Sequence, residues 1–163
     1  MSGSGSSQFT TSPEGRLREL GIQLPPAPTP FGAYVPAVQT GNLLVLSGML
    51  PTVGHEPKVL GRVGKEIDVE GGRSAARIAA LNALAVARQH LGSLDRVSRV
   101  VRLGVAIATW GDFSAHVKVA DSASELLRDI FGAERTSSRL IFGVASLPLG
   151  VPIALEVIFE VDR

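Results

Sequence analysis

The sequence has 163 residues, of which 45% are hydrophobic and 19% charged, and its 16 Lys+Arg against 15 Asp+Glu give a net charge of +1. This composition is typical of one globular domain with a buried core and excludes an intrinsically disordered chain. The near-neutral charge provides no electrostatic argument for binding nucleic acid or an anionic membrane.

The chain contains no cysteine, which excludes disulfides, thiolate metal sites and a cysteine nucleophile. No stretch reaches the roughly 18 continuous apolar residues that a membrane-spanning helix needs. The first residues, MSGSGSSQFTTSP, have neither the basic start nor the apolar core of a secretory signal. We therefore expect a cytoplasmic protein with no membrane partner. Residues 1–13 are expected to form a flexible N-terminal tail, and residues 14–163 a single domain.

The first half of the domain is predicted to contain a short helix, a hairpin and a long loop. Residues 14–20 favour a short helix, and the stretch LPPAPTPFGAY after it must run extended or turn because it holds four prolines. Two apolar runs flank Thr40-Gly41-Asn42, which predicts a β-hairpin with a tight turn. Residues 52–72 hold five glycines and a proline and are predicted to form a long irregular loop.

The second half alternates strands with two long helices. An alanine-rich helix is predicted over 73–91, ending at Gly92. A strand over 100–109 follows, and Asp112 is expected to cap a second helix that runs to Phe131. Two further strands are predicted over 140–147 and 153–161.

This order predicts an α+β sandwich with a mixed sheet and two long helices on one face. Two helices can cover only one face of such a sheet, yet the central strands are apolar on both faces. The second face therefore needs a cover, and a partner subunit is the simplest one. We expect a homo-oligomer from this packing argument alone.

The polar residues offer few candidates for a metal or nucleic-acid site. The three histidines (His55, His90 and His116) are scattered and none lies at ligand spacing from another, so no metal site is expected. Arg96, Arg99, Arg102 and Lys118 could form a basic patch. The chain has only one Trp and one Tyr, which argues against single-stranded nucleic acid as a partner.

Arg139 lies at the start of an apolar run, LIFGVASL, which makes it the main candidate for a site. An arginine at a strand edge is most often simply exposed to solvent. A desolvated guanidinium needs an anionic partner, because leaving it unpaired costs several kcal/mol. That partner could be Glu156 on the neighbouring last strand, or the carboxylate of a ligand, which arginine binds in bidentate geometry.

Several segments together resemble the RidA/YjgF family, and they cover about residues 20–161. They are PFGAYVPAVQTGNLLVLSGMLP, GRVGKE, AARIAALNALA, LGSLDRVSRVVRL, DFSAHVKVADSASELL and SSRLIFGVASLP. The LG..LP pattern near the start is most similar to a longer, divergent branch of that family. The resemblance implies a chorismate-mutase-like α+β fold in a homotrimer, with ligand pockets between subunits and no cofactor.

The resemblance also implies a site and a reaction, the hydrolysis of reactive 2-imino or enamino acids to 2-oxo acids and ammonia. Arg139 matches the family arginine that binds the substrate carboxylate. Tyr34, Ser47 and Gly48 match other residues of the substrate-binding pocket.

Three positions depart from the family pattern. A family glutamate that positions water is Ala154 here, and Glu156, two residues on, is the candidate to replace it as a catalytic residue. A pocket asparagine is Asp121, which would repel a substrate carboxylate if charged or indicate another ligand. A cysteine near the arginine is Ile141. A non-catalytic trimer that binds small carboxylates, as a sensor or chaperone-like protein, is therefore the alternative function. The ribonuclease activity attached to some family names ranks third, because of the near-neutral charge.

Overall fold

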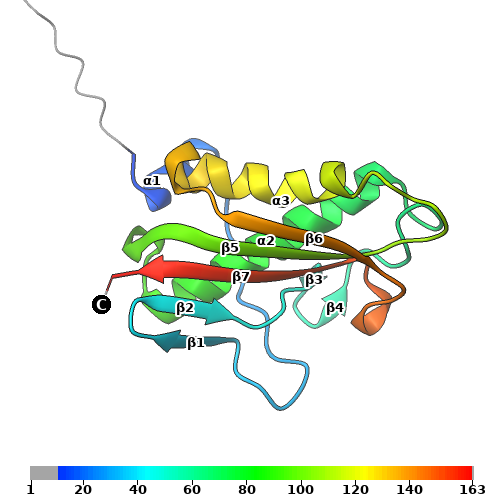
Figure 1. Ribbon diagram of the computed structural model, residues 1–163. Coiled ribbons are helices and arrows are strands. Elements are labelled where there is room, and N and C mark those ends of the chain that lie inside the picture. The colour runs from blue at the N-terminus through cyan, green and yellow to red at the C-terminus, as the bar shows by residue number, and fades with distance from the viewer. Residues whose placement is uncertain (1–10, 163) are drawn as a thin grey trace, which may run out of the picture.

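A five-stranded mixed β-sheet forms the centre of the computed structural model, which describes residues 11–162 (Figure 1). Its strands, in spatial order, are β1 (Ala37–Thr40), β2 (Leu43–Leu46), β7 (Ile153–Val161), β5 (Val97–Ala108) and β6 (Ser138–Val144). Only β5 and β6 pair in parallel, and the other neighbours are antiparallel. A separate small hairpin joins β3 (Thr52–Val53) to β4 (Glu56–Pro57). The predicted hairpin before residue 47 is confirmed, with Gly41 at φ 59° in its turn.

Two long helices, α2 (Val69–Leu91) and α3 (His116–Phe131), cover one face of this sheet (Figure 1). A short helix, α1 (Pro13–Glu19), lies against the end of α3. The alternate side chains of β7 that start at Ile153 point into the core between the layers, as predicted. The predicted α+β sandwich with two long helices on one face is therefore confirmed. Residues 1–10 of the predicted tail lie outside the described residues, and Pro13 is the first residue of α1.

Helix α2 ends where expected but begins four residues earlier than predicted. Gly92 follows its last residue in the left-handed conformation, at φ 85°. At the other end, the Asp68 carboxylate caps the helix by accepting a hydrogen bond from the Gly71 amide at 2.8 Å. Gly72 lies against α3, where an added Cβ would be only 3.2 Å from Val119. These glycines serve helix packing, so the prediction of an irregular loop over all of 52–72 is wrong. Only residues 58–68 are irregular.

Helix α3 begins at His116, and the prediction that Asp112 caps it is wrong. Its first turn follows Ala115, and no side chain donates or accepts a capping hydrogen bond there. Its buried stripe starts at Val119 and Ala120 and continues at helical spacing to Phe131, whereas Val117 is 56% exposed.

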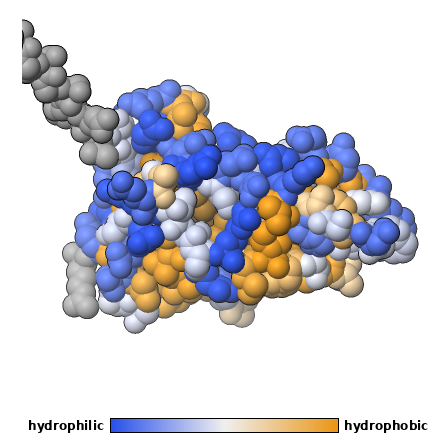
Figure 2. Space-filling view, turned by 45° about the horizontal axis from the view of Figure 1, so that its top comes forward, coloured by the Kyte–Doolittle hydropathy of each residue, from blue (hydrophilic) through white to orange (hydrophobic). Residues whose placement is uncertain are grey.

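The other face of the sheet has no cover in a single chain. Leu140 and Phe142 on the edge strand β6 are 49% and 47% exposed, and Val38 on the opposite edge is 54% exposed. Figure 2 shows hydrophobic atoms gathered in two areas with a hydrophilic strip between them. This face is therefore uncovered as predicted, but its central strands are not apolar throughout, because Arg102 on β5 pairs there with Glu156 on β7. The partner subunit expected there stays a prediction.

Candidate functional site

The predicted site residues lie in three separate places in one chain. Tyr34, Ser47 and Gly48 line one cavity together. Arg139 and Asp121 contact each other where β6 packs against α3. Glu156 lies on the uncovered face of the sheet.

The first place is a cavity of about 600 Å³ at the end of β2. Its lining is mostly apolar and consists of Phe31, Tyr34, Ser47, Gly48, Leu50, Pro148, Leu149 and Ala154. Ala154 contributes only a methyl group, so the wall has no titratable group at this position. The cavity can therefore hold an apolar group, and its side-chain polar contacts are limited to the two hydroxyls.

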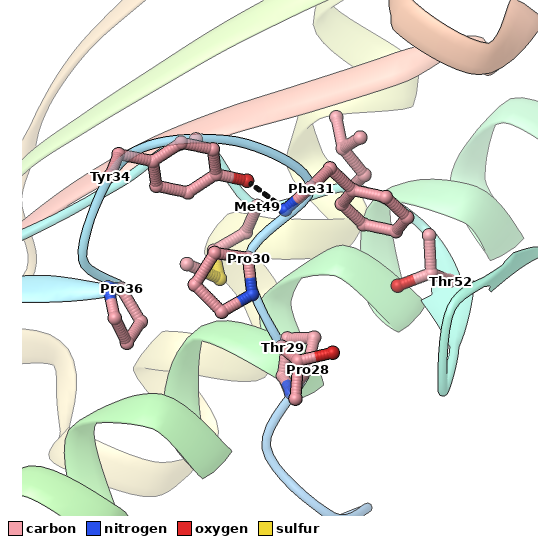
Figure 3. Close-up of a pocket in the computed structure, with 10 residues that line it drawn as sticks. Pro28, Thr29, Pro30, Phe31, Tyr34, Pro36, Met49 and Thr52 are labelled. Carbon is pink, nitrogen blue, oxygen red and sulfur yellow. Dashed lines mark hydrogen bonds between the residues drawn. The ribbon is translucent and has the colours of Figure 1, made fainter.

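The proline-rich segment before β1 positions both hydroxyls of this cavity. The Tyr34 hydroxyl accepts a hydrogen bond from the Phe31 amide at 2.9 Å, and Figure 3 shows its ring folded back along the segment. The Ser47 hydroxyl donates to the Val35 carbonyl at 2.6 Å. Tyr34 therefore keeps its own O–H proton for a ligand, since its recorded hydrogen bond uses the oxygen as acceptor.

A buried amide on α2 holds the backbone at Leu50, part of the cavity wall, and the sequence analysis missed it. Asn82 is 1% exposed, and its Nδ2 donates to the carbonyls of Leu50 and Thr52, both at 2.9 Å. Leu50 lines the cavity directly. The available signal was a single amide within the run AARIAALNALAVA, where every other residue except Arg77 is apolar.

Leu149, also missed, has the backbone conformation that L-residues avoid. Its φ is 62°, and it is the one non-glycine residue with positive φ among residues 11–162. Leu149 lines both the cavity of Tyr34 and a second cavity of about 400 Å³, which is also lined by Arg62 and Glu66. Hydrogen bonds from the Arg62 backbone amide and then from its guanidinium lower the pKa of Glu66 to about 2. Strained backbone of this kind is frequent at ligand sites.

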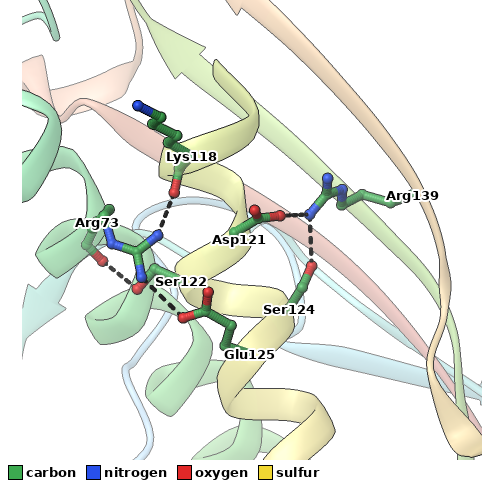
Figure 4. Close-up of polar contacts among 7 residues, drawn as sticks. All are labelled: Arg73, Lys118, Asp121, Ser122, Ser124, Glu125 and Arg139. Atoms are coloured by element: carbon green, nitrogen blue, oxygen red, sulfur yellow. Dashed lines mark hydrogen bonds and ion pairs between the residues drawn. The ribbon is translucent and has the colours of Figure 1, made fainter. Parts of the chain in front are cut away.

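The second place is the contact between β6 and α3. Arg139 pairs laterally with the buried Leu103, so its side chain points to the helix side of the sheet. Its Nη1 donates to Asp121 Oδ1 at 2.7 Å and to Ser124 Oγ at 3.0 Å (Figure 4). The Arg139 side chain is 25% exposed and that of Asp121 is 41% exposed. Asp121 is thus the intramolecular partner of Arg139, in place of Glu156.

Glu156 has a different partner on the uncovered face. Its Oε1 accepts a hydrogen bond from Arg102 Nε at 2.7 Å. Glu156 and Ala154 point to the same side because they are two residues apart on β7. The carboxylate closest in sequence to the missing family glutamate is therefore engaged in an ion pair.

One chain cannot bring Arg139 to the cavity of Tyr34. Ala154 points to the uncovered face, whereas Arg139 points to the helices, and strand β5 separates their strands. A ligand that touches both must lie between two copies of the chain.

Within residues 11–162 there is no group of three or more His, Cys, Asp or Glu side chains that could hold a metal ion. None of the described helices is long and apolar enough to cross a membrane.

Comparisons with known proteins agree on one family. Residues 14–160 match the family model described as "YjgF/chorismate_mutase-like, putative endoribonuclease". The chain is 37% identical to Protein TCP17 of Trypanosoma cruzi, over 90% of this chain and 92% of that protein. It is 31% identical to a 2-iminobutanoate/2-iminopropanoate deaminase of Dermatophagoides farinae, over 86% and 95% of the two chains. A crystal structure of an Agrobacterium tumefaciens protein of unknown function has 36% identity and a TM-score of 0.84, with 92% of each chain covered.

Proposed function

Because the chain belongs to the YjgF/chorismate-mutase-like family, we propose that it hydrolyses reactive 2-imino or enamino acids to 2-oxo acids and ammonia. The reaction takes place in pockets between the subunits of a homotrimer. The similarity to the 2-iminobutanoate/2-iminopropanoate deaminase of Dermatophagoides farinae supports this reaction class.

The observation that carries the proposal is the fixed position of Arg139 on β6, an edge strand of the sheet that pairs only with β5 among the described strands. Asp121 and Ser124 hold one nitrogen of its guanidinium, and β6 is an edge strand. The exposed Leu140 and Phe142 on the same strand give a second copy an apolar surface to bury. Such a contact supports an arrangement in which Arg139 of one subunit faces the cavity of its neighbour.

This reaction requires little catalytic assistance from the site. Imines hydrolyse without a catalyst. The protein therefore has to hold the substrate carboxylate, orient the attacking water and assist proton transfer. Arg139 binds the carboxylate, while the Tyr34 hydroxyl and the Gly48 backbone orient the rest of the substrate. Water adds to C2, the C–N bond breaks, and nitrogen leaves as ammonia while the C2 oxygen becomes the carbonyl. The residues of the site need no cofactor for these steps.

A non-catalytic carboxylate-binding trimer is the second candidate, and two residues favour it. Ala154 cannot move a proton, and Glu156 is paired with Arg102. The same pocket would then bind 2-oxo acids or related metabolites without converting them.

A coupled assay separates the two candidates. An amino-acid oxidase generates imino acids in place, and semicarbazide traps the imine that survives. The wild type is expected to lower the trapped imine, Arg139→Gln to abolish this effect, and Arg77→Gln, an exposed arginine on α2, to leave it unchanged. Equal activity in Arg139→Gln would refute the site. No acceleration together with Arg139-dependent ligand binding would establish the second candidate.

The assembly is tested by light scattering at micromolar protein. We expect three times the 17.1 kDa of one chain. A monomeric mass would refute both the trimer and the intersubunit pocket.

A further inference from the structure

The hydrogen bonds of Arg139 within the described chain use only some of its N–H donors. A guanidinium has five N–H donors, and Nη1 carries two of them. Both contacts described for Arg139 use Nη1, one to Asp121 and one to Ser124. Nε and Nη2 make no hydrogen bond with any residue in the range 11–162. Their three N–H groups form the planar fork that binds a carboxylate through two parallel hydrogen bonds.

Asp121 likewise has one carboxylate oxygen engaged and one available. Its Oδ1 accepts from Arg139, whereas Oδ2 has no hydrogen-bond partner within the described part of the chain. The side chain is 41% exposed, so a ligand can reach it. Figure 4 shows Asp121 and Arg139 side by side, with the carboxylate on α3 and the guanidinium reaching across from β6.

The neighbouring acidic residue on the same helix is engaged elsewhere. Glu125, one turn after Asp121, pairs with Arg73 on α2 at 2.9 Å. Arg135 lines a small cavity of about 180 Å³ beside Arg139 and adds positive charge there. The site thus has a positive side at Arg139 and a negative group at Asp121, a few ångströms apart.

This arrangement discriminates between ligands by their charge pattern. A ligand with only a carboxylate gains the Arg139 fork but is repelled by the nearby Asp121 carboxylate. A ligand with a carboxylate and a cationic nitrogen on the adjacent carbon meets one opposite charge at each end. Both charges act on such a ligand at short range, because Arg139 and Asp121 are in direct contact.

We infer that the Arg139–Asp121 pair makes the pocket selective for zwitterions, with the carboxylate on Arg139 and the cationic nitrogen on Asp121. The inference rests on the proposed function and narrows its substrate to the protonated imine, an iminium carboxylate. Protonation of the imine nitrogen makes C2 more electrophilic, so Asp121 holds the reactive form. The product 2-oxo acid has lost the nitrogen, and it binds less tightly and leaves.

Binding of two stable ligands with the same carbon skeleton tests this selectivity. Calorimetry at neutral pH compares L-2-aminobutanoate, a zwitterion, with 2-oxobutanoate, a simple anion. The wild type is expected to bind the amino acid at least about tenfold more tightly, which corresponds to about 1.4 kcal/mol. Asp121→Asn is expected to lose this preference, because the repulsion of the anion and the attraction of the ammonium group both disappear.

Glu125→Gln is the matched control, since it removes the same charge from the same helix face one turn away. It is expected to keep the wild-type preference. Circular dichroism confirms that each variant is folded.

Each outcome decides between the inference and the proposed function. Equal binding, tighter binding of the oxo acid by the wild type, or an unchanged preference in Asp121→Asn overturns the inference. If Arg139→Gln then loses both ligands, the carboxylate site itself stands. If neither ligand binds the wild type, or if Arg139→Gln binds both normally, the proposed function and the inference fall together.

Discussion

Replacing the buried Asn82 by leucine tests how the cavity wall is held. Leucine has the same branching at Cγ as asparagine, so the change removes the amide while keeping the shape of the side chain. The Thr52 carbonyl loses its Asn82 donor, whereas the Leu50 carbonyl still accepts from the Thr52 amide at 2.9 Å. A buried polar group left without its partner costs about 1–3 kcal/mol, so we expect a loss of about 1–3 kcal/mol in the free energy of unfolding.

Urea unfolding at one fixed protein concentration measures this loss, because the stability of an oligomer depends on concentration. The corresponding fall in melting temperature is roughly 2 to 12 °C for a chain of this length. Gln89→Leu, an exposed amide on the same helix, is the control and should stay within about 0.5 kcal/mol of the wild type. If Asn82→Leu is equally harmless, the carbonyls find other donors and the assignment of Asn82 as the support of this wall is refuted.

Three further changes test the helix ends and the strained loop. Burial raises the pKa of Glu14, but hydrogen bonds from Arg88 and from the Leu94 amide outweigh it and hold this pKa below its usual 4.5. The stabilisation from Glu14 is therefore complete above about pH 4.5 and is lost as the pH falls through the lowered pKa, so urea midpoints of Glu14→Gln should fall less on acidification than those of the wild type. Gly92→Ala is expected to cost about 1 kcal/mol because its φ is 85° and only the backbone is strained, whereas Gly48→Ala, without positive φ, should unfold at the wild-type urea concentration. Leu149→Asn should raise the urea midpoint by an equivalent of about 0.5–1 kcal/mol, since asparagine tolerates left-handed backbone, and a lowered midpoint would mean that the leucine side chain packs in the assembly.

Local signals in the sequence predicted the C-terminal ends of both long helices and both ends of β7, whereas the starts of α2, α3 and β5 were misplaced by three or four residues. Gly92 ends α2 and Gly41 turns the first hairpin because each position needs a positive φ, which the sequence reveals as an isolated glycine after a regular pattern. The same reasoning failed at Gly71 and Gly72, where glycine is needed for close packing against neighbouring side chains within a helix. A glycine can provide a positive φ at a turn or room for close packing inside a helix, and the sequence alone does not distinguish these two roles.

The side-chain partners of the site depended on tertiary packing and could not be read from spacing. Asp121 and Arg139 are 18 residues apart, and they meet because α3 returns across the face of β6. The strand pattern did predict that Ala154 and Glu156 share a face, and the structure adds that Arg102 is the partner of Glu156 on that face.

The position of Glu156 limits how it can replace the missing family glutamate. A shift of two residues along β7 keeps the face but moves the carboxylate by about 6.6 Å, away from the cavity wall at Ala154. There it lies beside Gly104, where an added Cβ would be only 3.3 Å from Glu156 Cβ. The absence of a side chain at Gly104 leaves room for Glu156 to pair with Arg102. A catalytic role for Glu156 therefore requires the carboxylate to leave Arg102 and extend along the strand towards the cavity, whereas the Arg139–Asp121 pair is already assembled in the single chain.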